Sequence, residues 1–162
     1  MAWTIPEAAR YESCVAVAFA IVCGVPVNEF TARLDAMGGK FMGTYHGQQC
    51  MDVAWEYGYA TTIIQRDPRI IPHDDLQASP VAITYPEGNK KRFMNYLKAQ
   101  KGVLGGIRDK GPTHLPIGHA VAWDTRAIYD PLGFVYDYQD AAKEPHKFFA
   151  NNFFMLTRRF QG

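Results

Sequence analysis

The spacing of hydrophobic residues changes near Gly58 and divides the chain into two kinds of predicted element. Before Gly58, apolar residues recur at helical spacing or in one continuous run, and glycines follow the segments, which predicts helices. After it, short β-branched and aromatic runs between turn-forming residues predict strands, with one further helix. The predicted helices cover residues 12–24, 29–37, 47–58 and 89–100, and the predicted strands cover 59–65, 80–85, 102–108, 118–124, 126–131 and 152–160.

The first predicted helix, ESCVAVAFAIVCG, is apolar on every side, which is typical of a helix buried in the middle of a fold. Glu12 and Ser13 are alternative first positions for this helix, and Gly24 ends it. Asn28 is the predicted N-cap of the second helix, and Asn89 is that of the fourth.

Helices first and strands joined by short turns afterwards predict an α+β fold with an antiparallel sheet, rather than alternating βαβ units. The chain has 162 residues, 48% of them apolar, which is enough for one domain with its own core and too short for two. We therefore expect a single domain over residues 1–162.

Charge and hydropathy narrow the classes of partner and location. The 17 basic and 16 acidic residues are spread along the chain, so nothing favours nucleic acid or an anionic membrane as a partner. The apolar run 15–22 is far shorter than the roughly 20 residues of a membrane span. The N-terminus lacks a basic segment followed by an apolar stretch, so we expect a cytoplasmic protein. Signal-less export or assembly into a particle would leave no trace in the sequence.

The three cysteines are too few and too scattered to predict a disulfide framework. Cys14 and Cys23 lie nine residues apart on one helix, about 13 Å along its axis, which is too far for a bridge. Cys50 could pair with either of them, and three free thiols in a reducing compartment are the simpler interpretation. Cys50 also follows His46 by four residues, but no CxxC and no third ligand accompany them, so we expect neither a metal site nor a cofactor.

The sequence GHAVAWDTRAIYDPLG predicts a hairpin that brings a histidine and an aspartate together. If Asp124 and Thr125 form a two-residue loop, His119 lies directly opposite Asp130, with Cβ atoms about 5 Å apart. A four-residue loop shifts the register by two and makes the pair diagonal, on the same face. Only a loop of odd length or a bulge separates the two side chains.

Cys14 is the candidate nucleophile because it opens the first helix. A helix N-terminus and a neighbouring imidazolium both stabilise a thiolate, and an aspartate beside the imidazole fixes its tautomer. The backbone N–H of Cys14 would also point toward a developing oxyanion. The candidate catalytic residues are therefore Cys14, His119 and Asp130. The alternative role for Cys14, which we expect for Cys23, is that of a small buried apolar side chain.

These residues and their order resemble the papain-like cysteine peptidase superfamily. Within it, they are most similar to the small bacterial branch that includes bacteriocin-processing, double-glycine-type peptidases. The segments SCVAVAFAIV and GHAVAWDTRAIYDPLG carry the resemblance. It implies a nucleophilic Cys14 at the start of a central helix, His119 on a strand and Asp130 on the next strand.

One position departs from the family pattern. The family carries a glutamine about six residues before the nucleophile as an oxyanion donor, and this chain has Ala8 there. Tyr11, Gln48 and Gln49 are the alternative donors. Loss of one such donor costs about 2.7–4 kcal/mol of transition-state stabilisation.

The function that we expect is a thiol hydrolase that cleaves a peptide or isopeptide bond in a peptide or protein substrate, through an acyl-thioester intermediate. Ala8 and the 22 aromatic residues favour the alternative, a catalytically inactive interaction or assembly module on the same fold with a protein partner, such as a phage or effector component. A third alternative is a cell-wall amidase or endopeptidase with a similar cysteine–histidine site.

Overall fold

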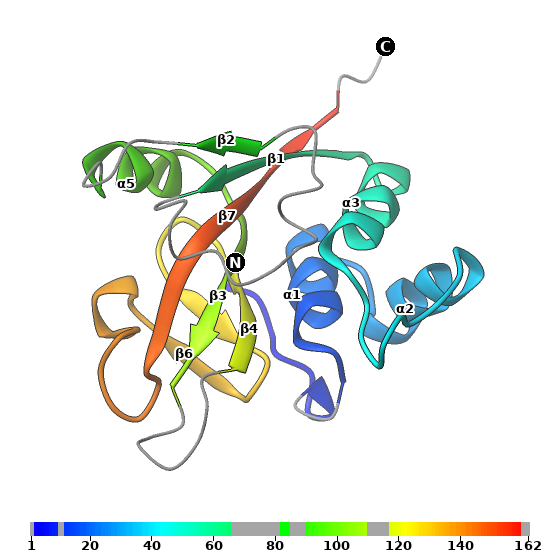
Figure 1. Ribbon diagram of the computed structural model, residues 1–162, viewed down its shortest axis with the longest axis horizontal. Helices are drawn as coiled ribbons and strands as arrows, with labels where there is room; N and C mark the ends of the chain where they lie inside the picture. Colours follow the sequence, from blue (N-terminus) through cyan, green and yellow to red (C-terminus); the bar gives the residue numbers. More distant parts are fainter. Residues whose placement is uncertain (1, 10–11, 66–81, 85–89, 110–116, 160–162) are drawn as a thin grey trace.

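The computed structural model describes residues 2–9, 12–65, 82–84, 90–109 and 117–159 and has the predicted α+β arrangement. The helices are α1 (Cys14–Cys23), α2 (Val27–Ala36), α3 (Gly47–Glu56) and α5 (Lys90–Ala99). The strands are β1 (Tyr59–Gln65), β2 (Ala82–Thr84), β3 (Gly102–Arg108), β4 (Ile117–Trp123), β5 (Ile128–Asp130), β6 (Phe134–Tyr136) and β7 (Phe148–Arg158). Figure 1 shows α1, α2 and α3 grouped on one side of the molecule and α5 far from them, beyond the strands.

The observed helix ends lie within two residues of the predicted ones. Gly24 ends α1 in the left-handed conformation, at φ 71°, as predicted. Helix α2 begins at Val27, with Pro26 as N-cap, so the predicted cap at Asn28 is wrong. The amide of Phe30 already donates to the carbonyl of Pro26, which makes Asn28 the second helical residue. The predicted cap at Asn89 lies outside the described residues.

The strands form one seven-stranded sheet in the order β2-β1-β7-β3-β4-β5-β6. Every described pairing is antiparallel except that of β1 with β2. Strands β1 and β3 have the predicted bounds, whereas β7 begins at Phe148 instead of residue 152, and β6 was not predicted. Asn151 and Asn152 obscure the apolar pattern of β7, yet both are buried beside the point where the register with β3 shifts.

The sheet separates two hydrophobic cores, because successive side chains of a strand point to opposite faces. In β3, Val103 belongs to the core beneath α1, α2 and α3, whereas Leu104 belongs to the core that α5 covers through Phe93 and Leu97. Eight of the ten residues of α1 are buried, so the prediction of a central buried helix is confirmed.

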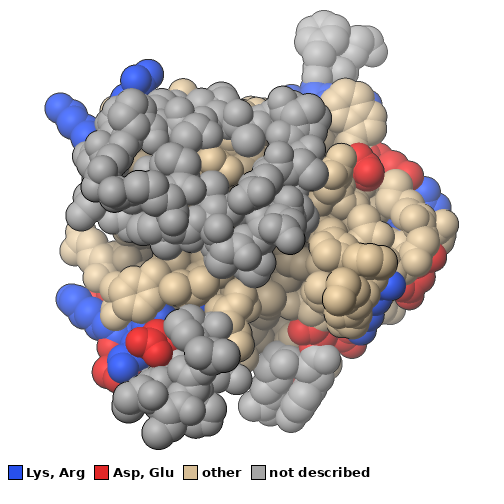
Figure 2. Space-filling model, in the orientation of Figure 1, with Lys and Arg blue, Asp and Glu red and all other residues tan. Residues whose placement is uncertain are grey.

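Figure 2 shows charged side chains of both signs at the lower left and at the right of the described surface, with uncharged side chains between them. Arg33 of α2 and Glu56 of α3 form one such pair, with 2.6 Å between Nη2 and Oε2. Within the described segments, no single helix is long and apolar enough to cross a membrane. Helices α1 and α2 pass that test only as a pair bent by 115°.

Candidate thiol site

Cys14 is the first residue of α1, directly after the N-cap Ser13. The residue is half-buried, whereas Ala16 and the residues after it in the helix are buried. Ser13 occupies the N-cap position but makes no side-chain capping hydrogen bond. The first helical hydrogen bond runs from the amide of Val17 to the carbonyl of Ser13. The backbone N–H groups of residues 14–16 therefore have no partner within the helix and point out of its N-terminus.

The β4–β5 hairpin corrects the predicted register. Trp123 pairs with Ile128 and Ala122 with Tyr129, so the loop has four residues instead of two. Direct opposition of His119 and Asp130 is therefore wrong, and the diagonal arrangement that a four-residue loop implies is correct. Both side chains stay on one face, because the shift is by an even number of residues.

The side chain of Asp124 explains the longer loop. Its Oδ1 accepts hydrogen bonds from the amides of Arg126 and Ala127, at 2.8 and 2.7 Å, and its Oδ2 accepts one from the Tyr129 hydroxyl at 3.0 Å. Thr125 takes a positive φ of 84° within this turn. An aspartate that bonds the next backbone amides in this way stabilises a wider turn than two residues allow.

His119 and Asp130 form a buried pair. Nε2 of His119 lies 2.9 Å from Oδ1 of Asp130, and the residues are 7% and 2% exposed. The edge of the Phe148 ring meets the imidazole, with 5.6 Å between centroids. Gly106, opposite His119 on β3, leaves room for β7, since a Cβ there would lie 2.0 Å from the Phe149 carbonyl oxygen. The histidine is thus held on a closely packed part of the sheet.

Three donors surround the carboxylate of Asp130. Besides His119, the amide of Leu132 donates to Oδ1 at 2.9 Å, and the hydroxyl of Tyr136 donates to Oδ2 at 2.8 Å. Burial by itself would raise the pKa of Asp130, but the hydrogen bonds from His119, Leu132 and Tyr136 and the charge of His119 outweigh burial and lower it. Asp130 is therefore an anion near neutral pH.

The imidazole of His119 connects Asp130 to Cys14. Burial lowers the pKa of His119, yet hydrogen bonds with Asp130 and Cys14 and the charges of both groups raise it to about 9. Because the ionised Asp130 accepts from Nε2, Nε2 carries a proton and Nδ1 is the nitrogen that remains for the Cys14 thiol. The structure thus brings all three predicted site residues together, in the order Cys14, His119, Asp130.

Sequence reasoning missed Tyr136 as a neighbour of Asp130. A signal is present in the sequence, since the turn formers in DPLG precede the run FVY, but three residues are fewer than a strand pattern needs. In the structure, Gly133 donates its amide to the Asp130 carbonyl and β6 pairs with β5. Tyr136 then lies diagonal to Asp130 on the same face of the sheet.

The alternative oxyanion donors have different surroundings. Ala8 and Gln48 are exposed, and Tyr11 lies outside the described residues. Gln49 uses both ends of its amide elsewhere: Nε2 donates to the Gly39 carbonyl and Oε1 accepts from the His46 amide at the start of α3. The Cys14 amide is the donor that the described residues place beside the thiol.

The remaining cysteines are packed as structural thiols. All three cysteines are free, which excludes the bridges from Cys50 to Cys14 or Cys23. Burial raises the pKa of Cys23 to about 12, although the charges of Lys101 and Arg158 lower it. Cys50 is fully buried in the core beneath the helices. The described residues contain no group of three or more potential metal ligands.

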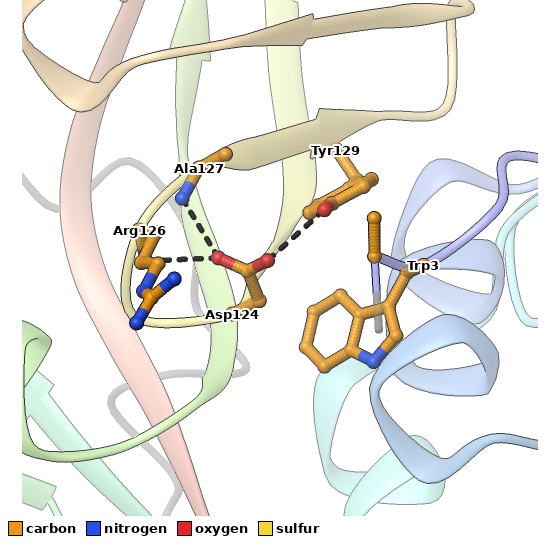
Figure 3. Close-up of a pocket in the computed structure, with 6 residues that line it drawn as sticks. Trp3, Asp124, Arg126, Ala127 and Tyr129 are labelled. Atoms are coloured by element: carbon orange, nitrogen blue, oxygen red, sulfur yellow. Dashed lines mark hydrogen bonds between the residues drawn. The ribbon is translucent and has the colours of Figure 1, made fainter.

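A pocket of about 540 Å³ lies away from this site, between the N-terminal segment and the β4–β5 turn (Figure 3). Its lining consists of Ala2, Trp3, Asp124, Arg126, Ala127 and Tyr129. The rings of Trp3 and Tyr129 lie 5.4 Å apart, and the Asp124 carboxylate between them and Arg126 already accepts the three hydrogen bonds of its own turn.

The contacts of Lys101 show that this pocket lies near the C-terminal end of α1, away from Cys14. Its Nζ lies 5.9 Å from the centroid of the Trp3 ring and donates to the Val22 carbonyl at 3.1 Å. Val22 is eight residues after Cys14, roughly 12 Å along the helix axis. The pocket therefore contains none of the three predicted site residues.

Comparisons of the chain with protein-family models, with curated proteins and with solved structures found no match.

Proposed function

We propose that this protein is a cysteine hydrolase in which Cys14 is the nucleophile, His119 the general base and acid, and Asp130 the residue that orients His119. One observation carries the proposal: the histidine of a buried histidine–aspartate pair interacts with a half-buried thiol at a helix N-terminus. An imidazolium and a helix N-terminus both favour the thiolate, which is the reactive form of cysteine.

The first half of the reaction would form a thioester. The Cys14 Sγ proton moves to Nδ1 of His119, which gives the thiolate–imidazolium pair that the raised pKa of His119 favours. The sulfur then attacks the carbonyl carbon of a peptide or isopeptide bond. The carbonyl oxygen becomes an anion in the tetrahedral intermediate and accepts a hydrogen bond from the Cys14 amide. The C–N bond breaks as the imidazolium gives its proton to the leaving amine, and the acyl group remains on sulfur.

The second half would return the free enzyme. Water gives a proton to Nδ1 of His119 as its oxygen attacks the thioester carbon. The C–S bond then breaks, the carboxylic acid leaves, and the proton on His119 returns to Cys14 Sγ. Asp130 keeps its charge throughout and stabilises the imidazolium that forms in each half. Every step uses groups of this chain and water, with no external cofactor.

The proposed fold class is papain-like, in one domain, with a peptide or protein as substrate. Its support is the order of the parts: a buried helix that begins with the thiol, followed by an antiparallel sheet whose neighbouring strands β4 and β5 carry the histidine and the aspartate. This order matches the resemblance that the sequence suggests.

Alkylation by iodoacetamide at pH 6 tests the activated thiol, with adducts mapped by mass spectrometry. We expect Cys14 to react about 100-fold faster than Cys23 or Cys50, because a thiol without such neighbours is almost fully protonated at that pH. Cys23 and Cys50 are internal controls in the same chain. A Cys14 that reacts no faster than they do would falsify the proposal.

Turnover distinguishes the hydrolase from its alternatives. A library of fluorogenic peptides, isopeptide-linked peptides and purified peptidoglycan provides substrates for the peptidase and for the cell-wall enzyme. Cys14→Ala should lower the rate on the substrate that is cleaved by at least about 10³-fold, whereas Cys23→Ala should leave it unchanged.

The exposed Ala8, where the family carries an oxyanion donor, favours the alternative of a non-catalytic module. A reactive Cys14 with no turnover on any substrate class would support that module and overturn the hydrolase.

A further inference from the structure

The hydroxyl of Tyr136 is the sole described donor to Oδ2 of Asp130. His119 and the amide of Leu132 both donate to Oδ1, at 2.9 Å each, whereas Tyr136 donates to Oδ2 at 2.8 Å. The two donors on Oδ1 and the one on Oδ2 hold the carboxylate at both oxygens. The donor on Oδ2 therefore adds to the resistance against rotation about the Cβ–Cγ bond, a rotation that would turn Oδ1 away from His119.

The ring of Tyr136 is itself held in place. The imidazole of His146 stacks on it with 3.6 Å between centroids and 14° between planes. The ring of Phe134 contacts that imidazole in turn, with 5.4 Å between centroids and 67° between planes. Tyr136 is 8% exposed and belongs to the core that α5 covers. Burial raises the pKa of Tyr136, as do the charge of Asp130 and the hydrogen bond to it, so the hydroxyl keeps its proton and stays a donor.

We propose that Tyr136 is a positioning residue of the thiol site: its hydroxyl orients the Asp130 carboxylate, which in turn aims Nδ1 of His119 at the Cys14 thiol. The role rests on the proposed function, because Tyr136 acts on Cys14 only through Asp130 and His119. Tyr136 does not touch the thiol or a substrate, so its effect should appear in the pH dependence of Cys14 reactivity.

The chain offers a matched control in Tyr129. Its hydroxyl also donates to the carboxylate of a half-buried turn aspartate, Asp124, at 3.0 Å, and Tyr129 is 4% exposed. Burial and the hydrogen bond to Asp124 raise the pKa of Tyr129, so it is a donor of the same kind. Tyr129→Phe and Tyr136→Phe each delete one tyrosine–aspartate hydrogen bond and keep the ring, but only the second bond reaches Asp130.

The test measures Cys14 alkylation by iodoacetamide from pH 4 to pH 9 in the full chain, with melting temperatures as a check on folding. We expect Tyr136→Phe to lower the rate at pH 6 about tenfold, as the loss of one hydrogen bond to a charged group predicts. The acid limb of its profile should move to higher pH, because the Asp130 carboxylate has lost a donor that favours its charged form. Tyr129→Phe should lower the melting temperature by a similar amount and leave the profile of Cys14 unchanged.

A double-mutant cycle distinguishes a role of Tyr136 in positioning Asp130 from a general loss of packing around the site. With Asp130→Asn in the background, Tyr136→Phe should have little further effect on the rate, because the two residues act in series. Additive effects, or equal effects of Tyr136→Phe and Tyr129→Phe on Cys14, overturn the role of Tyr136 while the proposed function stands. If Cys14 of the unaltered protein is no more reactive than Cys23, the proposed function fails first, and the role of Tyr136 fails with it.

Discussion

Helix α1 carries a cysteine at each end, and the two thiols differ in their burial and in the groups beside them. Cys14 is half-buried at the N-terminus beside His119, whose pKa is raised to about 9 against the opposing effect of burial. Cys23 is buried at the C-terminus, where burial raises the pKa of its thiol to about 12. About 13 Å of helix separates the thiol of the proposed site from a thiol that is packed in the core.

The comparison shows that a nearby positive charge does not by itself activate a thiol. Lys101 and Arg158 act on Cys23 and lower its pKa, but burial outweighs them. The ammonium of Lys101 is engaged with the Val22 carbonyl and the Tyr59 hydroxyl, at 3.1 and 2.8 Å. At the other end, the thiol lies at the helix N-terminus and beside a histidine that Asp130 holds.

The largest effect that we predict comes from removing the imidazole. His119→Ala should lower the alkylation rate of Cys14 at pH 6 about 100-fold, because the thiolate loses its cation. The rate at Cys23 should not change, and mass spectrometry of the two peptides reports both from one sample. A Cys14 rate that survives this substitution would show that the helix end alone distinguishes the two thiols.

The next largest effect that we predict is a pH dependence of the free energy of unfolding. It arises from His119, beside Cys14. The pKa of His119 is raised from its usual value near 6.5 to about 9 by folding. Its contribution to stability is therefore complete below about pH 6.5 and is lost as pH rises through about 9. The free energy of unfolding should fall by about 2 kcal/mol between pH 7 and pH 9 from this group.

Urea unfolding at several pH values measures this loss. His119→Gln is the control, since its stability should decline less steeply over the same pH range. Parallel curves for the two proteins would mean that other groups cause the decline.

A smaller effect on the free energy of unfolding should follow from the difference in burial between Cys14 and Cys23. Cys23→Ser puts a hydroxyl among apolar side chains and should lower the free energy of unfolding by about 2 kcal/mol. Cys14→Ser, at the half-buried end, should cost less than about 1 kcal/mol. Urea unfolding of both variants checks the order, and equal costs would contradict the contrast in burial between the two ends.

The smallest effect that we predict is a loss of stability at the C-terminal end of helix α1. Lys101→Met keeps the aliphatic stem but removes the hydrogen bonds to Val22 and Tyr59, and it should cost about 1 kcal/mol of stability. The alkylation rate of Cys14 should be unchanged, as measured on the same preparations. A slower Cys14 in this variant would show that the two ends of α1 are coupled.

Most elements were predictable because their patterns are local. The continuous apolar run predicted α1 as a buried helix. Gly24 ends this helix in the left-handed conformation, as glycine commonly does at a helix C-terminus. The bounds of β1 and β3 were also predictable from β-branched and aromatic runs. The start of α2 was not, since Asn28 is the better cap by residue type but Pro26 takes that position.

The sequence by itself determined which side chains could serve a thiol site, because residue type and strand parity are local properties. Cys14 at the head of a helix, and His119 with Asp130 on neighbouring strands, follow from patterns within a few residues of each. Tertiary structure decided the rest. The side chain of Asp124 bonded the turn amides and lengthened the loop to four residues, and the short edge strand β6 brought Tyr136 to Asp130. Such contacts depend on how side chains pack across strands, which no spacing along the chain records.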